Sequence, residues 1–323
     1  GVMDRLGVGY DDLKKENEKL IYCSLTGYGQ DGPFAQKAGH DINYMATSGV
    51  LSLTGKPGEL PPTIGFQAAD TAGALNGVIG ILSALVERGT TGRGQLVDIS
   101  LTESVMTLGM LSLVHAVAGY DMRGADPLSG MLPNYRTYRT KDNKHLSIGA
   151  LEPHFWKKLC STAGIPETVK SSEQFDAIFA EKTKAEWDEV FASADVCFEA
   201  IEGPSDIATH PQHVSRNVVL TDPKLPRKQL VLGPRMSNHP SVLLDPAPMI
   251  GEHTATILQQ SGYTLQEIAS MHSNGSVFCL TQPDPEQVAP PKQTEVMTKI
   301  PDECTQLKPY RVMLEADTDY WWC

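Results

Sequence analysis

A histidine and a neighbouring aspartate stand out among the residues that can exchange protons near neutral pH. Residues 38–44, Ala-Gly-His-Asp-Ile-Asn-Tyr, place His40 and Asp41 between a glycine-rich turn and an apolar run. A titratable pair at the start of a helix suits general acid–base chemistry. Aspartate is also a preferred N-cap residue, so the alternative interpretation is that Asp41 only caps this helix and His40 sits on its rim.

Two further carboxylates occupy positions that suggest chemistry. Asp70 precedes a long helix predicted over residues 71–87, where it is either an N-cap or a carboxylate held beside oriented backbone N–H groups. Glu152 directly follows a hairpin predicted over residues 135–149 from its alternating pattern and polar turn. Each carboxylate therefore stands at the end of a predicted element, where loops commonly carry functional groups.

Helices and strands alternate around these residues. Buried strands are predicted over residues 20–25 and 95–101, and helices over residues 10–18, 71–87 and 103–117. Glycines at helical spacing in the segment 71–87 indicate close packing against a neighbour or a ligand. The fold class expected is α/β. We expect residues 1–120 to form a Rossmann-like large domain that is incomplete at its N-terminus.

The remainder of the chain divides by composition. A smaller α+β domain is expected over residues 121–217, a return segment to the large domain over 218–272, and a poorly ordered tail over 273–323. Two S/T-x-x-E capping boxes predict helix starts at Thr183 and Thr264.

A glycine pattern in residues 27–32, Gly-Tyr-Gly-Gln-Asp-Gly, matches the dinucleotide fingerprint G-x-G-x-x-G. Pro33 follows at once, and residues 33–37 lack the long apolar-faced helix that the fingerprint requires. We therefore interpret this stretch as a loop next to the site.

Composition excludes several classes of function. The chain has 323 residues and a formal net charge of -12, which argues against nucleic acid or an anionic membrane as the main partner. Six scattered cysteines without a C-x-x-C motif make a disulfide framework or a structural metal site unexpected. The best apolar run, residues 72–86, contains three glycines and Asn76, so we expect no integral membrane segment.

Several motifs together resemble the class III CoA-transferase family, and within it the α-methylacyl-CoA racemase branch. The strings that carry the resemblance are Leu-Ile-Tyr at 20–22, Thr-Gly-Tyr-Gly-Gln at 26–30, Ala-Gly-His-Asp-Ile-Asn-Tyr at 38–44, Thr-Gly-Arg-Gly-Gln at 91–95 and Ile-Gly-Glu-His-Thr at 250–254. The likeness covers about residues 1–271 and is specific as a set. It implies an interlocked homodimer with the active site between large and small domains.

The resemblance also implies roles for individual residues. His40 corresponds to the racemase base, Asp70 to the opposing carboxylate and Glu152 to the residue that pairs with the histidine. The backbone stretch that contacts the CoA thioester corresponds to Gly39, His40, Asp41, Ile42, Asn43 and Tyr44. No metal or separate cofactor is implied, since CoA is part of the acyl-CoA substrate.

The expected reaction is inversion of the carbon α to a thioester in 2-methyl-branched acyl-CoA. Two acid/base groups must flank that carbon, with donors that stabilise the enolate oxygen between them. Backbone N–H groups near Asp70 and Gly39 are the candidate donors. Four methionines are interpreted as core packing rather than as a compliant surface for the acyl chain: Met106, Met110, Met122 and Met131.

Two alternatives stay open. The wider family shares the Asp70 position but not the histidine, and in its transferases the aspartate is the nucleophile that forms an acyl-enzyme. The chain is therefore alternatively a CoA-transferase that uses an aspartyl intermediate, or an inactive truncated form. The resemblance implies a mitochondrial or peroxisomal location, although the final residues, Tyr-Trp-Trp-Cys, are not a Ser-Lys-Leu-type signal.

Overall fold

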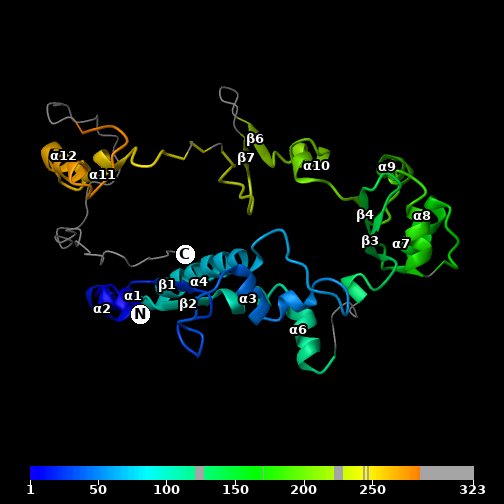
Figure 1. Ribbon diagram of the computed structural model, residues 1–323, viewed down its shortest axis with the longest axis horizontal. Helices are drawn as coiled ribbons and strands as arrows, with labels where there is room; N and C mark the ends of the chain where they lie inside the picture. Colours follow the sequence, from blue (N-terminus) through cyan, green and yellow to red (C-terminus); the bar gives the residue numbers. More distant parts are fainter. Residues whose placement is uncertain (121–126, 170, 222–227, 243, 246, 284–323) are drawn as a thin grey trace. The chain divides into compact units, whose positions relative to one another are not determined.

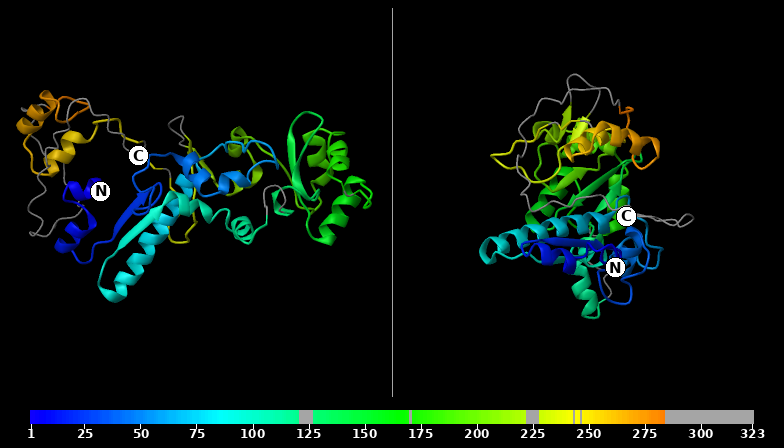
Figure 2. Two further views of the ribbon diagram at one scale, coloured as in Figure 1. Left: turned by 60° about the horizontal axis from the view of Figure 1, so that its bottom comes forward. Right: turned by 90° about the vertical axis from the view of Figure 1, so that its left-hand side faces the viewer.

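Two parallel strands and the long helix between them frame the N-terminal part of the chain. In this computed structural model, which describes residues 1–120, 127–169, 171–221, 228–242, 244–245 and 247–283, β1 (Tyr22–Thr26) pairs in parallel with β2 (Leu96–Ser100). Parallel strands need a crossover connection, and α4 (Ala68–Thr91) supplies it and packs on both strands (Figures 1 and 2). The predicted strands and the mixed α/β class are confirmed.

Glycines let α4 approach its neighbours closely. A Cβ added to Gly73 would lie 2.1 Å from Leu101 Cδ2, and one added to Gly80 would lie 2.6 Å from Val97 Cγ1. Both distances are far shorter than carbon–carbon contacts allow. The glycine spacing therefore reports packing against α5 (Leu101–Met106) and β2, as the sequence indicated.

Short helices complete this part of the chain. Their bounds are α1 (Val2–Arg5), α2 (Tyr10–Glu16), α3 (Asp41–Thr47), the 3-10 helix Val50–Leu53, α5 and α6 (Met110–Val117). The helix predicted over 103–117 is wrong as a single element, because it is interrupted between Met106 and Met110. The interruption contains Gly109, and glycine is among the poorest residues for a helix interior.

The residues that follow form a three-stranded antiparallel sheet covered by helices on one face. The strands β3 (Tyr135–Arg139), β4 (His145–Gly149) and β5 (Phe198–Ala200) lie in the order β3-β4-β5, which confirms the predicted hairpin. A 3-10 turn, Pro127–Ser129, precedes the sheet, and its helices are α7 (Pro153–Ala163), α8 (Ser172–Phe179) and α9 (Lys184–Phe191). Tyr138, Leu146, Phe175, Phe179 and Trp187 are almost fully buried in this part's own hydrophobic core.

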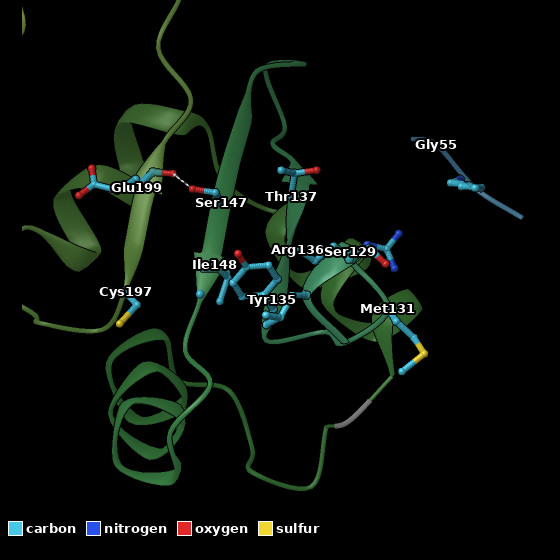
Figure 3. A pocket seen from close by; sticks show the side chains of 14 residues that line it. Gly55, Ser129, Met131, Tyr135, Arg136, Thr137, Ser147, Ile148, Cys197 and Glu199 are labelled. Atoms are coloured by element: carbon cyan, nitrogen blue, oxygen red, sulfur yellow. Dashed lines mark hydrogen bonds between the residues drawn. The ribbon is translucent and has the colours of Figure 1, made fainter. Parts of the chain in front are cut away.

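The opposite face of this sheet borders an open pocket of about 990 Å³ (Figure 3). Its lining includes Thr137 on β3, Ser147 on β4 and Glu199 on β5. The Ser147 hydroxyl donates a hydrogen bond of 3.1 Å to the Glu199 carbonyl. Cys197 also lines the pocket in a left-handed conformation, with φ of 53°. His40, Asp70 and Glu152 are not among its lining residues.

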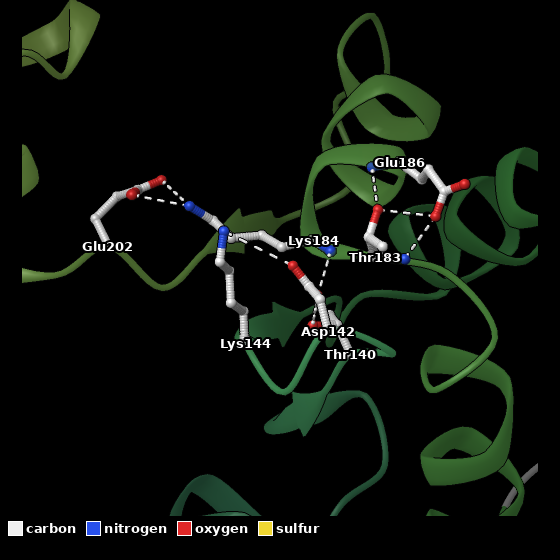
Figure 4. A network of polar contacts seen from close by, with 7 residues as sticks. All are labelled: Thr140, Asp142, Lys144, Thr183, Lys184, Glu186 and Glu202. Carbon is white, nitrogen blue, oxygen red and sulfur yellow. Dashed lines mark hydrogen bonds and ion pairs between the residues drawn. The ribbon is translucent and has the colours of Figure 1, made fainter.

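A polar network joins the turn of the hairpin to the start of α9 (Figure 4). Asp142 Oδ1 accepts hydrogen bonds from the Thr140 hydroxyl at 2.6 Å and from the Lys184 backbone N–H at 3.0 Å. These two bonds hold the pKa of Asp142 below its ordinary value. The Lys184 ammonium in turn contacts both carboxylate oxygens of Glu202, at 2.8 and 2.9 Å.

Both predicted capping boxes are present. At the start of α9, the Thr183 N–H donates to Glu186 Oε2 at 2.7 Å and the Glu186 N–H donates to the Thr183 hydroxyl at 3.3 Å. The same reciprocal pair joins Thr264 and Glu267 at the start of α12 (Leu265–Ser273). Both pairs satisfy N–H groups that the helices cannot pair internally.

The described chain divides between Ile207 and Ala208 into two compact units. The described elements at and after the boundary are the 3-10 helix Pro204–Ala208, α10 (Pro211–Ser215), the antiparallel pair β6 (Val219–Thr221) and β7 (Lys228–Leu230), α11 (Thr254–Gln260) and α12. The Leu280 N–H donates to the Gly251 carbonyl at 3.0 Å. The rest of the predicted tail, residues 284–323, lies outside the described residues, and the predicted domain boundaries stay predictions.

Much of α4 presents apolar side chains to solvent. Leu75, Ile79, Leu82 and Val86 are each more than half exposed. Among the described helices, α4 is the one long and apolar enough to cross a membrane by length and composition, a test that the core helix of a soluble protein also passes.

Candidate functional site

His40 stands at the N-cap position of α3. Its backbone is extended, with φ of -127° and ψ of 175°, and its N–H donates to Asn43 Oδ1 at 3.0 Å. This bond fixes the peptide that carries His40, while the imidazole stays exposed to solvent. A solvent-accessible imidazole on a fixed backbone can meet a substrate without rearrangement of the chain.

The interpretation of Asp41 as the cap of its own helix is wrong. Asp41 is the first residue of α3, and its Oδ2 accepts hydrogen bonds from the backbone N–H groups of Ala69 at 2.7 Å and Asp70 at 3.1 Å. It therefore caps α4, a helix that begins 27 residues later in the chain. Sequence patterns detect local caps, and a cap that acts across the fold leaves no local signature.

Asp70 lies in the first turn of α4, beside both members of the His-Asp pair. Burial and the negative charge of Asp41 raise the pKa of Asp70, and His40 opposes them with a lowering influence. Carboxyl groups at the first turn of a helix are ordinarily favoured in their charged form. The arrangement thus places a carboxyl group with a raised pKa beside an imidazole.

Tyr44 packs and hydrogen-bonds next to the segment that carries His40. Its ring is 7% exposed and packs edge-on against Tyr28, with centroids 5.1 Å apart. Its hydroxyl donates to the Gly39 carbonyl at 2.5 Å. A Cβ on Gly27 would lie 2.2 Å from the Tyr44 ring, so glycine is required there.

The loop interpretation of the glycine pattern is confirmed, since no helix follows it before α3. The Gly27 carbonyl accepts hydrogen bonds from the Thr102 N–H at 3.0 Å and the Thr102 hydroxyl at 2.7 Å. The loop begins at the C-terminal end of β1, the edge where open α/β sheets place their ligands.

Backbone donors for an oxyanion are available on α3 rather than on α4. The N–H groups of Ala69 and Asp70 are already bonded to Asp41. In the part of the chain that the structure describes, the N–H groups of Asp41 and Ile42 have no acceptor. Both belong to the first turn of a helix, where such groups have no partner within the helix.

Glu152 is the N-cap residue of α7 and is exposed. Within the described residues it makes no contact with His40 or Asp70, so the structure brings together two of the three predicted catalytic residues. Burial, and then the negative charge of Glu152, raise the pKa of the Cys197 thiol.

The methionines are not core residues, contrary to the interpretation favoured by their sequence. Met106, Met110 and Met131 are 37%, 62% and 48% exposed, and Met122 lies outside the described residues. No group of three or more His, Cys, Asp or Glu side chains in the described ranges is arranged to hold a metal ion.

Comparison with known proteins now decides the family. The sequence model of CoA-transferase family III matches residues 1–254. The chain belongs to CoA-transferase family III. As a member of that family it carries the His40 and Asp70 pair on an α/β framework that its structural relatives share.

Relatives in the family include both isomerases and transferases. The chain is 36% identical to mouse alpha-methylacyl-CoA racemase over 291 residues, which are 85% of this chain and 76% of that protein. It is 28% identical to mouse succinyl-CoA:glutarate CoA-transferase over 281 residues, which are 80% and 64% of the two chains. A CaiB/BaiF family protein from Brucella suis has a similar structure, with a TM-score of 0.69, 28% identity and coverage of 80% of this chain and 72% of that one.

Two residues that shape the site have roles that the sequence does not predict. Gly27 and Tyr44 both belong to strings that carry the family resemblance, but neither string indicates that the Tyr44 ring packs against Gly27. A small residue placed directly after a strand and an aromatic residue in the first turn of the next helix are the available clues, because close backbone approach needs glycine.

Proposed function

We propose that this chain is an isomerase that racemises the α-carbon of 2-methyl-branched acyl-CoA thioesters. The observation that carries the proposal is the pairing of His40 with a carboxyl group whose pKa is raised, Asp70, at two adjoining helix starts. The similarity to alpha-methylacyl-CoA racemases supports it.

The proposed chemistry uses each residue in two protonation states. Neutral His40 removes the α-proton from one enantiomer, so the C–H electron pair moves into an enolate whose oxygen takes up the negative charge. Protonated Asp70 then donates its proton to the opposite face of the α-carbon, and the roles reverse for the mirror-image substrate. The N–H groups of Asp41 and Ile42, which have no acceptor among the described residues, are the proposed donors to the enolate oxygen.

The second candidate function is CoA transfer through an acyl-Asp70 intermediate. Similarity to succinyl-CoA:glutarate CoA-transferase and the exposure of Asp70 favour it. A nucleophilic carboxylate must be ionised, however, and the raised pKa of Asp70 works against ionisation. We therefore place racemisation first.

We also propose that the chain forms a homodimer, in which Glu152 pairs with a His40 imidazole. Ile79, Leu82 and Val86 on α4 are exposed and line one shallow pocket, and an exposed apolar patch of this kind supports an interface. Glu152 lacks a cationic partner in the described chain, which is consistent with a partner that assembly supplies.

The experiment that tests the function is α-proton exchange. A single enantiomer of a 2-methylacyl-CoA is incubated with the protein in D2O, and the α-position is followed by NMR while chiral analysis follows inversion. We expect deuterium at the α-carbon and a mixture of enantiomers. CoA transfer to a free dicarboxylic acid without deuterium uptake would replace this proposal with the second one, and absence of both reactions would favour an inactive form.

A further inference from the structure

One carboxylate joins the starts of the two helices that carry His40 and Asp70. Asp41 Oδ2 receives the N–H groups of Ala69 and Asp70 at 2.7 and 3.1 Å. Ala69 is fully buried, so the Asp41 carboxylate accepts a hydrogen bond from a part of α4 that packing already immobilises. Asp41 itself is only half-buried and is the residue directly after His40.

The hydrogen bonds of the Asp41 carboxylate to α4 also offset electrostatic repulsion between two helix N-termini. Helices α3 and α4 both direct the positive ends of their dipoles, and their unpaired N–H groups, toward the same place. Two such ends repel each other unless a negative charge or an acceptor lies between them. The Asp41 carboxylate supplies both, and no other described side chain bonds to the Ala69 or Asp70 N–H group.

We infer that Asp41 is the positioning residue for proton transfer: its carboxylate locks the start of α4 to the start of α3 and so holds Asp70 and His40 at a fixed separation. The inference rests on the proposed function. It goes beyond that function by assigning the Asp41 side chain a task that joins two helices.

The carboxylate acts in two ways that substitution can separate. Its oxygen is a hydrogen-bond acceptor, which sets geometry, and its charge disfavours ionisation of Asp70. The charged groups that act on Asp70 are Asp41 and His40, both at the start of α3; the described groups of α5, β1 and β2, which also pack against α4, add none. Asparagine keeps the acceptor oxygen and removes the charge, whereas alanine removes both.

The test compares Asp41→Ala, Asp41→Asn and the matched control Asp11→Asn in the α-proton exchange assay. Asp11 is an exposed aspartate on α2, away from the His40 segment in sequence, and it has no hydrogen bond or ion pair in the described structure. We expect Asp41→Ala to lower kcat by about 10²-fold with a much smaller change in KM, the effect of misplacing a catalytic group by roughly 1 Å. Asp41→Asn should restore most of kcat, and the pH limb that reports Asp70 should move to lower pH, because removal of a nearby negative charge lowers the pKa of an acid.

A second measurement does not depend on activity. Hydrogen exchange of the Ala69 and Asp70 amides should be faster in Asp41→Ala and close to the unmodified chain in Asp41→Asn. If the unmodified chain fails to exchange the α-proton, the proposed function falls, and the amide protection still decides whether Asp41 locks the two helices. Unchanged amide protection in Asp41→Ala would overturn the inference, as would equal losses of kcat in the alanine and asparagine variants.

Discussion

Replacement of Gly27 by alanine tests whether the packing beneath the His40 segment determines the site. The added methyl carbon would lie 2.2, 2.5 and 2.7 Å from Cε1, Cζ and the hydroxyl oxygen of Tyr44. Gly27 does not adopt a positive φ, so alanine strains no backbone torsion and the effect is steric alone. The Tyr44 ring cannot simply yield, because it is buried against Tyr28 and its hydroxyl is bonded to the Gly39 carbonyl.

The magnitude follows from two terms. Overpacking of a filled core costs about 1–3 kcal/mol, and loss of the Tyr44 hydroxyl bond adds about 1 kcal/mol, so we expect Gly27→Ala to destabilise this part of the chain by about 2–4 kcal/mol. Release of the Gly39 carbonyl also frees the peptide that precedes His40. A displacement of roughly 1 Å at that position should lower kcat by about 10²-fold.

The assay must report the correct part of the chain. The described tryptophans, Trp156 and Trp187, both belong to the core around the three-stranded sheet, so their fluorescence does not monitor Gly27. The surroundings of Gly27 are monitored by hydrogen exchange of the amides in α3 and α4 and by α-proton exchange of the substrate. Gly65→Ala is the matched control, because a Cβ there has no atom within 4 Å. A Gly27→Ala protein with the amide protection and activity of the unmodified chain would refute the reasoning.

Three further predictions concern the site and the part of the chain around the three-stranded sheet. His40→Ala and Asp70→Asn should each abolish α-proton exchange, whereas a transferase would tolerate loss of the histidine much better; assays of both reactions decide. The pKa of Asp70 is raised in the folded chain, so the stability that Asp70 contributes is fully present below the ordinary aspartate pKa and is lost as pH rises through the folded pKa. Asp70→Asn should therefore flatten the pH dependence of α4 stability over that range, as measured by hydrogen exchange. The folded pKa of Asp142 is lowered, so its contribution is present above the ordinary value and is lost as pH falls through the folded one; Asp142→Ala should lower the unfolding temperature reported by Trp187 fluorescence near neutral pH and should reduce its dependence on acid.

Local patterns predicted the elements and failed where contacts span the chain. Alternation and turn residues located the hairpin of β3 and β4, and capping boxes located the starts of α9 and α12, because these signals lie within a few residues of each other. The role of the Asp41 side chain depends on a helix that begins 27 residues later, so no window of sequence contains it. The exposure of Met110 on α6 likewise depends on which surfaces the fold leaves uncovered, which apolar character alone does not reveal.

The sequence predicted which residues belong to the candidate site better than it predicted how the fold brings them together. His40 and Asp70 lie at adjoining helix starts, whereas Glu152 caps α7 without contact to either residue in the described chain, and the catalytic roles of all three stay predictions. The sequence names a residue's chemical type and its position on an element. The separation between elements is decided by packing, and Glu152 belongs to a part of the chain with a hydrophobic core of its own.

The proposed preference for racemisation over acyl transfer depends on the protonation of Asp70 as well as on the presence of His40. A carboxyl group in the first turn of a 24-residue helix would ordinarily favour its ionised form, which is the nucleophile that a transferase needs. In this chain the Asp41 carboxylate already occupies the N–H groups of that helix and sets a negative charge beside Asp70. The same bridge that fixes the distance between His40 and Asp70 therefore also disfavours the ionised aspartate, and both consequences favour proton transfer over acyl transfer.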